Sequence, residues 1–349
     1  MWILTLLLFI LILGIIILVH EFGHFIWAKT FGVHIYEFSI GMGPVVFSKK
    51  GKDGINYNLR AFPIGGFVQM AGEVYEDDED IPKEKFMCNK KWHQRLIILI
   101  AGVVNNFILA IVLLFFYGLI WGVTSNGTVV KEAKPDYPMA QAGIVAGDEI
   151  ISINGHKTNT WDKAQIILAF KNKNEYYTFE VKHQDGKVDT YKITPKTEKN
   201  EDGEETKVFG VAIDTEAKQG FFASIKFAFQ KFGSVIETMA LTVTSLFSGK
   251  LSVNSLSGPV GIYQVVGQGI NLGISYLVYI LAFLSINVGF INILPFPAFD
   301  GGRVLFMIIE KIIGRPVDSK IENVFHAVGF FLLMLLMVYI TFQDIIRLF

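Results

Sequence analysis

The chain has 349 residues, 52% of them hydrophobic and 31 of them phenylalanine, which is too apolar for an ordinary soluble domain of this length. The formal net charge of -1 gives no general basic surface, and no known nucleic-acid-binding motif is present. The single cysteine, Cys88, excludes an intramolecular disulfide and any zinc cluster built on cysteines. We therefore expect an integral membrane protein that has no nucleic-acid partner.

Four stretches are long and apolar enough to span about 30 Å of hydrocarbon. They cover residues 2–26, 96–121, 275–296 and 327–343. Lysine and arginine are concentrated in the loops that follow the first and third spans, so both loops are predicted to face the cytoplasm. The two termini and the region 122–274 are then expected outside. The first span lacks the basic start and small-residue cleavage site of a signal peptide, and we expect it to be retained.

Residues 1–32 are predicted to form the first transmembrane helix, which contains the motif His20-Glu21-Phe22-Gly23-His24. On a helix, residues four apart share one face with Cβ atoms about 6 Å apart, so both histidines can bind one metal ion. Glu21 projects beside that metal, where it can take a proton from a water whose pKa the metal lowers to about 7. A chance match would place ionisable groups in hydrocarbon at a cost of about 2.5–3.5 kcal/mol each. The motif therefore indicates metal-dependent hydrolysis at membrane depth.

Residues 33–95 are predicted to form a cytoplasmic, membrane-associated β-rich loop. Short β segments at 45–47, 55–59 and 63–68 are separated by turn residues, and two glycines stand in the segment 41–44. The same turn signals also fit an ordinary cytoplasmic hairpin. Residues 96–121 form the second predicted transmembrane helix.

Residues 122–215 have the composition of a soluble α+β domain. Five strand-like runs surround one predicted helix at 161–170; the runs are 128–130, 149–153, 177–181, 191–194 and 208–213. The stretch Ala140 to Gly155 resembles the core motif of PDZ domains, which bind an extended peptide as an added strand. A PDZ-like domain that acts only as a steric plug is the alternative.

Residues 216–274 are predicted to form amphipathic, peripheral helices and a linker. A broad apolar surface is interrupted by Lys226, Lys231 and Glu237, and a fifth transmembrane span would place these charges in lipid. The apolar surface consists of Phe221, Phe222, Ile225, Phe229, Phe232, Val235, Ile236 and Met239.

Residues 275–299 are predicted to contain the third transmembrane helix and the start of the sequence NILPFPAFDGG. A catalytic zinc usually has three protein ligands, and Asp300, at the same membrane depth as His24, is the candidate for the third. Irregular backbone at this depth must be buried in protein or line a cavity. The alternative is that Asp300 only caps the following helix, 303–313. Residues 300–326 are predicted to form a cytoplasmic loop and helix, and 327–349 the fourth transmembrane helix.

Together, HEFGH, NILPFPAFDGG and the PDZ-like stretch resemble the bacterial site-2 protease family, specifically its regulator-of-sigma-E-protease group. This resemblance implies Zn²⁺ as the cofactor, with His20, His24 and Asp300 as ligands, Glu21 as general base and Asn292 holding the substrate or an oxyanion. It also implies that the β-rich loop presents the substrate as an extended strand. Shorter segments agree with it: GMGP at 41–44, PIGGFV at 63–68, AG at 101–102 with NF at 106–107, and SGPVGI at 257–262.

This sequence departs from the family pattern in small ways. Val103 stands where the family usually has proline, and Phe299 where it usually has leucine; neither change removes a catalytic atom. Only one PDZ-like unit fits before the third span, whereas some members have two. How strictly large substrates are excluded therefore stays open.

The predicted fold is a polytopic α-helical membrane protein with four transmembrane helices, a membrane-associated β-rich loop and one extracytoplasmic PDZ-like α+β domain. The predicted function is that of a zinc-dependent endopeptidase of the bacterial inner membrane. We expect it to cut single-span membrane proteins such as anti-sigma factors or remnant signal peptides, with the active site toward the cytoplasm. A zinc transporter and a non-enzymatic PDZ scaffold are the alternatives, and the sequence leaves the oligomeric state open.

Overall fold

The computed structural model describes residues 2–72, 80–123, 125–170, 175–199, 205–213, 219–315 and 317–347. The chain folds into two compact units, Met1–Leu113 with Leu256–Phe349 and Leu114–Ser255. Four of the described helices are long and apolar enough to cross a membrane, which confirms the number of predicted spans. They are α1 (Trp2–Thr30), α2 (Trp92–Trp121), α7 (Ile274–Ile293) and α9 (Ser319–Ile346).

Helix α1 packs against α6 (Pro259–Leu272) and α7 through a small apolar core. Ile12 and Ile16 of α1 are buried there against Val266 and Ile280. Gly267 of α6 allows a close approach, because a Cβ at that position would lie 3.2 Å from Cγ2 of Thr5. These contacts hold the part of α1 that precedes the two histidines in the sequence.

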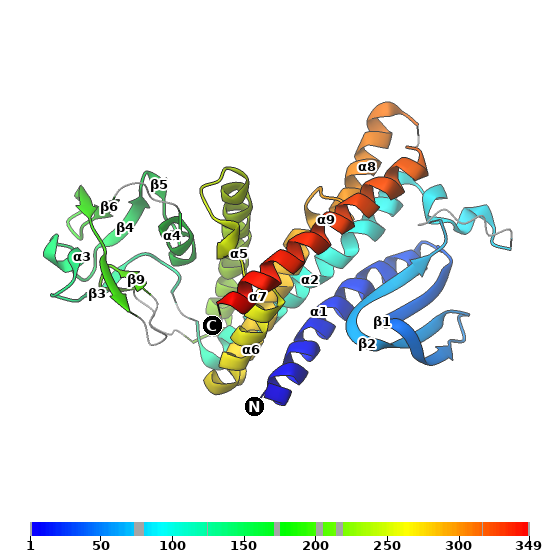
Figure 1. Ribbon diagram of the computed structural model, residues 1–349, viewed down its shortest axis with the longest axis horizontal. Helices are drawn as coiled ribbons and strands as arrows, with labels where there is room; N and C mark the ends of the chain where they lie inside the picture. The colour runs from blue at the N-terminus through cyan, green and yellow to red at the C-terminus, as the bar shows by residue number, and fades with distance from the viewer. Residues whose placement is uncertain are drawn as a thin grey trace. The chain divides into compact units, whose positions relative to one another are not determined.

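The β-rich loop is an antiparallel hairpin of two long strands, β1 (Ile35–Lys50) and β2 (Asn56–Met70), beside α1 (Figure 1). The predicted β segments at 45–47, 55–59 and 63–68 lie almost entirely within these strands, which are longer and more continuous than predicted. Gly41 and Gly43 lie inside β1 with φ of +87° and +85°, where they shift the register instead of ending the strand. The turn lies farther along, where Gly51 N–H donates to the carbonyl of Ile55 at 2.8 Å.

The base of this hairpin belongs to the apolar core around α1. Phe38 and Val68 are buried against Phe25 and Ala28 of α1. The outer part of the hairpin leaves large apolar side chains exposed, namely Met42, Val45, Val46, Phe47, Leu59 and Phe62. The base therefore fixes the hairpin to α1, and the outer part presents an apolar surface.

Helix α8 (Asp300–Ile313) follows a short non-helical turn after α7, and one of its side chains and one of its carbonyl groups contact the start of α2. Arg95 Nη1 lies 2.9 Å from Oε2 of Glu310, and Trp92 Nε1 donates to the carbonyl of Met307 at 3.2 Å. The short helices η1 (Lys83–Lys85) and η2 (Met87–Asn89) lie between β2 and α2 in the sequence. Helix α9 begins at Ser319, earlier than the predicted start of the fourth span at 327.

The second unit contains an α+β domain with an apolar core. A four-stranded sheet has the order β5-β4-β6-β7, and β3 pairs with β10 and β8 with β9. Its core contains Met139, Ile150, Ile167, Phe179 and Val181, all at most 1% exposed. The strands are β3 (Val130–Ala133), β4 (Glu149–Ile153), β5 (His156–Lys157), β6 (Tyr177–Lys182), β7 (Val188–Ile193), β8 (Lys196–Lys199), β9 (Glu205–Val208) and β10 (Val211–Ile213).

This domain has a second helix, α3 (Pro138–Gln141), besides α4 (Trp161–Leu168), so the prediction of a single helix was wrong. Helix α3 is a single turn opened by Pro138, too short to show a helical apolar period in the sequence. Strands β5, β8 and β9 were also not predicted. They are short, and β8 and β9 are mostly polar, so no apolar alternation marks them.

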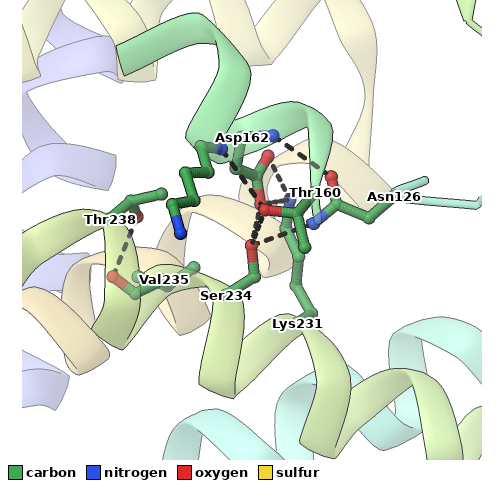
Figure 2. Close-up of polar contacts among 8 residues, drawn as sticks. Asn126, Thr160, Asp162, Lys231, Ser234, Val235 and Thr238 are labelled. Carbon is green, nitrogen blue, oxygen red and sulfur yellow. Dashed lines mark hydrogen bonds and ion pairs between the residues drawn. The ribbon is translucent and has the colours of Figure 1, made fainter. Parts of the chain in front are cut away.

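Helix α5 (Phe221–Phe247) packs against α4 through a polar seam (Figure 2). Lys231 Nζ lies 2.7 Å from Oδ2 of Asp162, and Ser234 Oγ donates to the same oxygen at 2.8 Å. Lys163 Nζ lies 2.6 Å from Oε1 of Glu237. Two of the three charges that argued against a fifth span are therefore paired with the α+β domain.

Candidate metal centre

Three predicted ligands from two distant parts of the sequence converge in the first unit. His20 Nε2 lies 3.0 Å from Oδ2 of Asp300, and His24 Nε2 lies 3.4 Å from the same oxygen. The two Nε2 atoms are 3.2 Å apart. Both histidines are buried, and Asp300 is partly buried. The three side chains therefore direct one donor atom each toward a common point.

This arrangement fits a metal ion. Oδ2 of Asp300 is buried and has no hydrogen-bond partner among the described residues, although both imidazoles lie within 3.4 Å of it. A buried carboxylate oxygen without such a partner is costly unless a cation is bound. Two imidazole nitrogens and one carboxylate oxygen form the ligand set of catalytic zinc sites, which keep a fourth position open. In the described part of the chain, no other group of histidine, cysteine and acidic residues converges in this way.

Two glycines make room for this centre between α1 and α2. A Cβ at Gly102 would lie 2.4 Å from Nε2 of His24 and 2.7 Å from Cε1 of His20. A Cβ at Gly23 would lie 2.4 Å from the carbonyl oxygen of Ala101. Contacts this short are not tolerated, so both positions require glycine for the two helices to approach at the level of the histidines.

Hydrogen bonds on the far side of each ring determine which nitrogen is free for the metal. His24 Nδ1 donates to the carbonyl of Ile98 at 2.8 Å, which leaves Nε2 as the lone-pair nitrogen. Nδ1 of His20 lies 3.3 Å from the amide nitrogen of Asn106, a residue that is 0% exposed.

The Oδ1 atom of Asn106 is buried and has no hydrogen-bond partner among the described residues. The oxygen and nitrogen of an amide are assigned from their hydrogen bonds. Exchanging Oδ1 and Nδ2 of Asn106 gives Oδ1 the partner that it lacks. Oδ1 then accepts the proton of His20 Nδ1, and Nε2 of His20 is free to bind the metal.

Asp300 is not the cap of the following helix. It is the first residue of α8, and the N-cap position is held by Phe299, which makes no side-chain hydrogen bond to the helix. The alternative reading of Asp300 was therefore wrong. The next glycines allow a sharp turn, since a Cβ at Gly301 would lie 2.2 Å from the carbonyl oxygen of Leu294.

Glu21 is partly buried on α1, and β2 passes close to it. A Cβ at Gly66 would lie 3.5 Å from Cγ of Glu21 and 2.9 Å from the carbonyl oxygen of Ser39. The backbone of the hairpin therefore runs beside the predicted general base. Asn292 lies in the last turn of α7 and is partly buried; its part in the site stays a prediction.

Sequence reasoning missed the residues that support the ligands. Asn106 belongs to one of the quoted family segments, and its position in an apolar span was the available signal. Nothing in the sequence paired it with His20. The carbonyl of Ile98 has no sequence signal at all, because any residue supplies one.

Comparisons with known proteins identify the family of this chain. The model of peptidase family M50 matches residues 8–336. The chain is 32% identical to the regulator of sigma-W protease RasP of Bacillus subtilis, with 100% of both chains covered. It is 31% identical to the zinc metalloprotease RasP of Shouchella clausii and 32% identical to that of Bacillus licheniformis, with 99% of each chain covered in both cases. These matches support zinc as the cofactor and protease as the activity, in place of a transporter or a scaffold. The chain belongs to peptidase family M50, the site-2 proteases, and is an intramembrane zinc metalloprotease.

Proposed function

We propose that His20, His24 and Asp300 hold the zinc ion and that Glu21 is the general base of peptide hydrolysis. The convergence of three donor atoms on one point, with Oδ2 of Asp300 lacking a hydrogen-bond partner among the described residues, carries this proposal. When bound, zinc polarises the scissile carbonyl and lowers the pKa of water to about 7. Glu21 accepts the proton of the attacking water and transfers it to the leaving amine.

The hairpin β1–β2 is proposed to present the substrate. Residues 37–40 of β1 pair with both 66–69 and 56–59, whereas 66–69 of β2 have no second strand partner in the described structure, and β2 runs past Glu21 at Gly66. An extended peptide can add to such an edge through its main chain. A helical substrate must unwind there, because the hydrogen bonds of a helix occupy its carbonyl groups. Asn292 is proposed to hold the unwound segment or an oxyanion.

The proposed substrates are single-span membrane proteins, such as anti-sigma factors already trimmed outside the membrane, or remnant signal peptides. The Bacillus subtilis relative is named a regulator of sigma-W protease, which supports a substrate that controls a sigma factor. The positive loops support a multi-pass arrangement in the bacterial inner membrane, with the active site toward the cytoplasm. The α+β domain, proposed to be PDZ-like, then lies outside, where it selects substrates by binding a peptide or by excluding large ones.

The test compares metal content and cleavage in purified full-length variants. Glu21→Gln is expected to retain zinc and to lose cleavage of a single-span reporter by a factor of about 100 or more, because only the base is removed. Asp300→Ala is expected to lose both zinc and cleavage. The control Glu180→Gln changes an exposed carboxylate of the α+β domain and is expected to match the wild type in both measurements. Equal cleavage by Glu21→Gln and wild type would exclude Glu21 as the base.

A further inference from the structure

The turn that delivers Asp300 to the metal centre contains a strained residue. Ala298 has a φ of +71°, in the left-handed region that residues with a Cβ rarely adopt. Only Asn154 shares this feature among the described residues other than glycine. Such backbone persists only where the surrounding structure holds it, and it is concentrated at functional sites. A contact from the surrounding structure must therefore hold Ala298 in this conformation.

His326 of α9 makes this contact. The N–H of Ala298 donates to Nδ1 of His326 at 3.0 Å. A ring nitrogen that accepts from an N–H carries no proton, so the imidazole is neutral and its proton is on Nε2. Nε2 is buried and has no hydrogen-bond partner among the described residues; Oε1 of Glu322 lies 3.9 Å away. Within the described residues, the N–H of Ala298 is thus the hydrogen-bond partner that orients this ring.

The same face of α9 is shaped to receive the turn. A Cβ at Gly329 would lie 1.8 Å from Cβ of Pro297, so glycine is required for the turn to reach the helix. A Cβ at Gly302 would lie 3.2 Å from Cε1 of His326. His326 and Gly329 are three residues apart and share a helix face. The turn is therefore in close contact with α9 immediately before and after Asp300.

We propose that His326 is a positioning residue of the metal centre. By accepting the N–H of Ala298, it holds the left-handed turn that directs the Asp300 carboxylate toward His20 and His24. The inference rests on the proposed role of Asp300 as a zinc ligand. It adds that zinc binding requires the lone pair on Nδ1 of His326 as a hydrogen-bond acceptor. His326 does not contact the substrate or the metal in this proposal.

Substitutions at His326 distinguish the effect of its hydrogen-bond acceptor from the effect of the volume of its ring. Asparagine places a side-chain oxygen near the position of Nδ1 and keeps the acceptor, whereas phenylalanine keeps a ring and removes the acceptor. Zinc retention by purified full-length protein is measured against increasing chelator. His326→Phe is expected to weaken zinc binding about tenfold or more, the size of effect found for outer-shell partners, and His326→Asn by about threefold or less. The control Val324→Leu, at a side chain 62% exposed on the same helix, is expected to behave as wild type.

A second substitution tests the link through the backbone. Glycine adopts positive φ without the strain that alanine carries, so Ala298→Gly reduces the need for an external hydrogen bond. The double variant Ala298→Gly/His326→Phe is expected to bind zinc more tightly than His326→Phe alone. Additive effects of the two changes would contradict coupling between these residues. Equal zinc loss in His326→Phe and His326→Asn would assign His326 to packing alone and overturn the proposal, as would wild-type retention in His326→Phe.

Asp300→Asn distinguishes this inference from the function on which it rests. If Asp300→Asn keeps zinc with wild-type affinity, the proposed ligand set is wrong and both proposals fail. If Asp300→Asn loses zinc while His326→Phe retains it, the ligand set stands and the role of His326 is rejected. Thermal unfolding of each variant is measured in parallel. A fall in stability common to His326→Phe and His326→Asn, with zinc affinity unchanged, also rejects it.

Discussion

At the scale of single residues, the metal centre combines local and distant contributions. His20 and His24 are four residues apart on one helix, so their spacing alone predicts a shared face, with Glu21 beside it. Asp300 could be predicted because an acidic group at membrane depth requires a cation. Asn106 and His326 could not be assigned, because their contacts join helices far apart in the sequence and depend on the packing of the folded chain.

Asn106 is expected to set the proton position on His20. Asn106→Ala removes the acceptor for Nδ1–H, and zinc affinity is expected to fall about 10–100-fold. Asn106→Asp keeps an oxygen that accepts this proton and is expected to retain more zinc than Asn106→Ala. Zinc content after dialysis against a chelator measures both. Weaker zinc binding in Asn106→Asp than in Asn106→Ala would show that the amide nitrogen, not the oxygen, faces His20.

Gly102 is expected to admit no side chain. Gly102→Ala would place Cβ 2.4 Å from Nε2 of His24, so the variant is expected to lose most of its zinc and its cleavage activity. Gly14→Ala is a matched control, because it lies on a transmembrane helix and a Cβ there would meet no atom within 4 Å. Metal analysis and reporter cleavage check both variants. Full zinc content in Gly102→Ala would contradict the close approach of α1 and α2.

At the scale of elements, the helices were predicted better than the strands. Length and apolar composition suffice to predict a transmembrane helix. A single segment can form all its backbone hydrogen bonds in lipid only as a helix. In β1, by contrast, Gly41 and Gly43 carry the turn chemistry that usually ends a strand, and only the pairing of Met42 with Phe62 of β2 shows that the strand continues. The partners of Lys231 and Glu237 could not be predicted either, because the strands β6 to β10 separate α4 from α5 in the sequence.

The seam between α4 and α5 is expected to depend on pH. Burial raises the pKa of Asp162, but the Lys231 ammonium and hydrogen bonds from Ser234 and Asn126 outweigh burial and hold this pKa below its usual range. A carboxylate whose pKa is depressed by folding contributes stability that is complete above its unfolded pKa of about 3.9. That contribution is lost as the pH falls through the lower folded value.

Asp162→Asn is therefore expected to loosen α5 at neutral pH. The Asp162 side chain is 24% exposed, so the expected decrease in the local opening free energy is modest, about 1 kcal/mol. Hydrogen exchange of the α5 amides measures it, with Asp136→Asn as an exposed control. The difference from wild type is expected to shrink as the pH is lowered below about 4. A difference that stays constant down to that pH and below would show that the charge of Asp162 is not its source.

At the scale of the whole molecule, the proposed chemistry is confined to one of the two units. All the proposed ligands and the general base belong to the first unit, whereas the α+β domain and α5 belong to the second. The abrupt change from apolar to mixed composition after the second span predicts a separate domain at 122–215, whereas the second unit begins at Leu114 and also contains α5. The sequence could not predict the contacts that organise each unit, such as the α4–α5 seam or the turn against α9.

The predicted orientation can be tested with the single native cysteine. Cys88 is an exposed free thiol in the loop between the first and second spans, which is predicted to be cytoplasmic. A membrane-impermeant maleimide is therefore expected to label the wild-type protein in inverted membrane vesicles and not in intact spheroplasts. In the variant Cys88→Ser/Lys187→Cys, the thiol moves to an exposed position of the α+β domain, and the pattern is expected to reverse. Labelling of Cys88 in intact spheroplasts would invert the proposed topology and place the metal centre toward the outer side of the membrane.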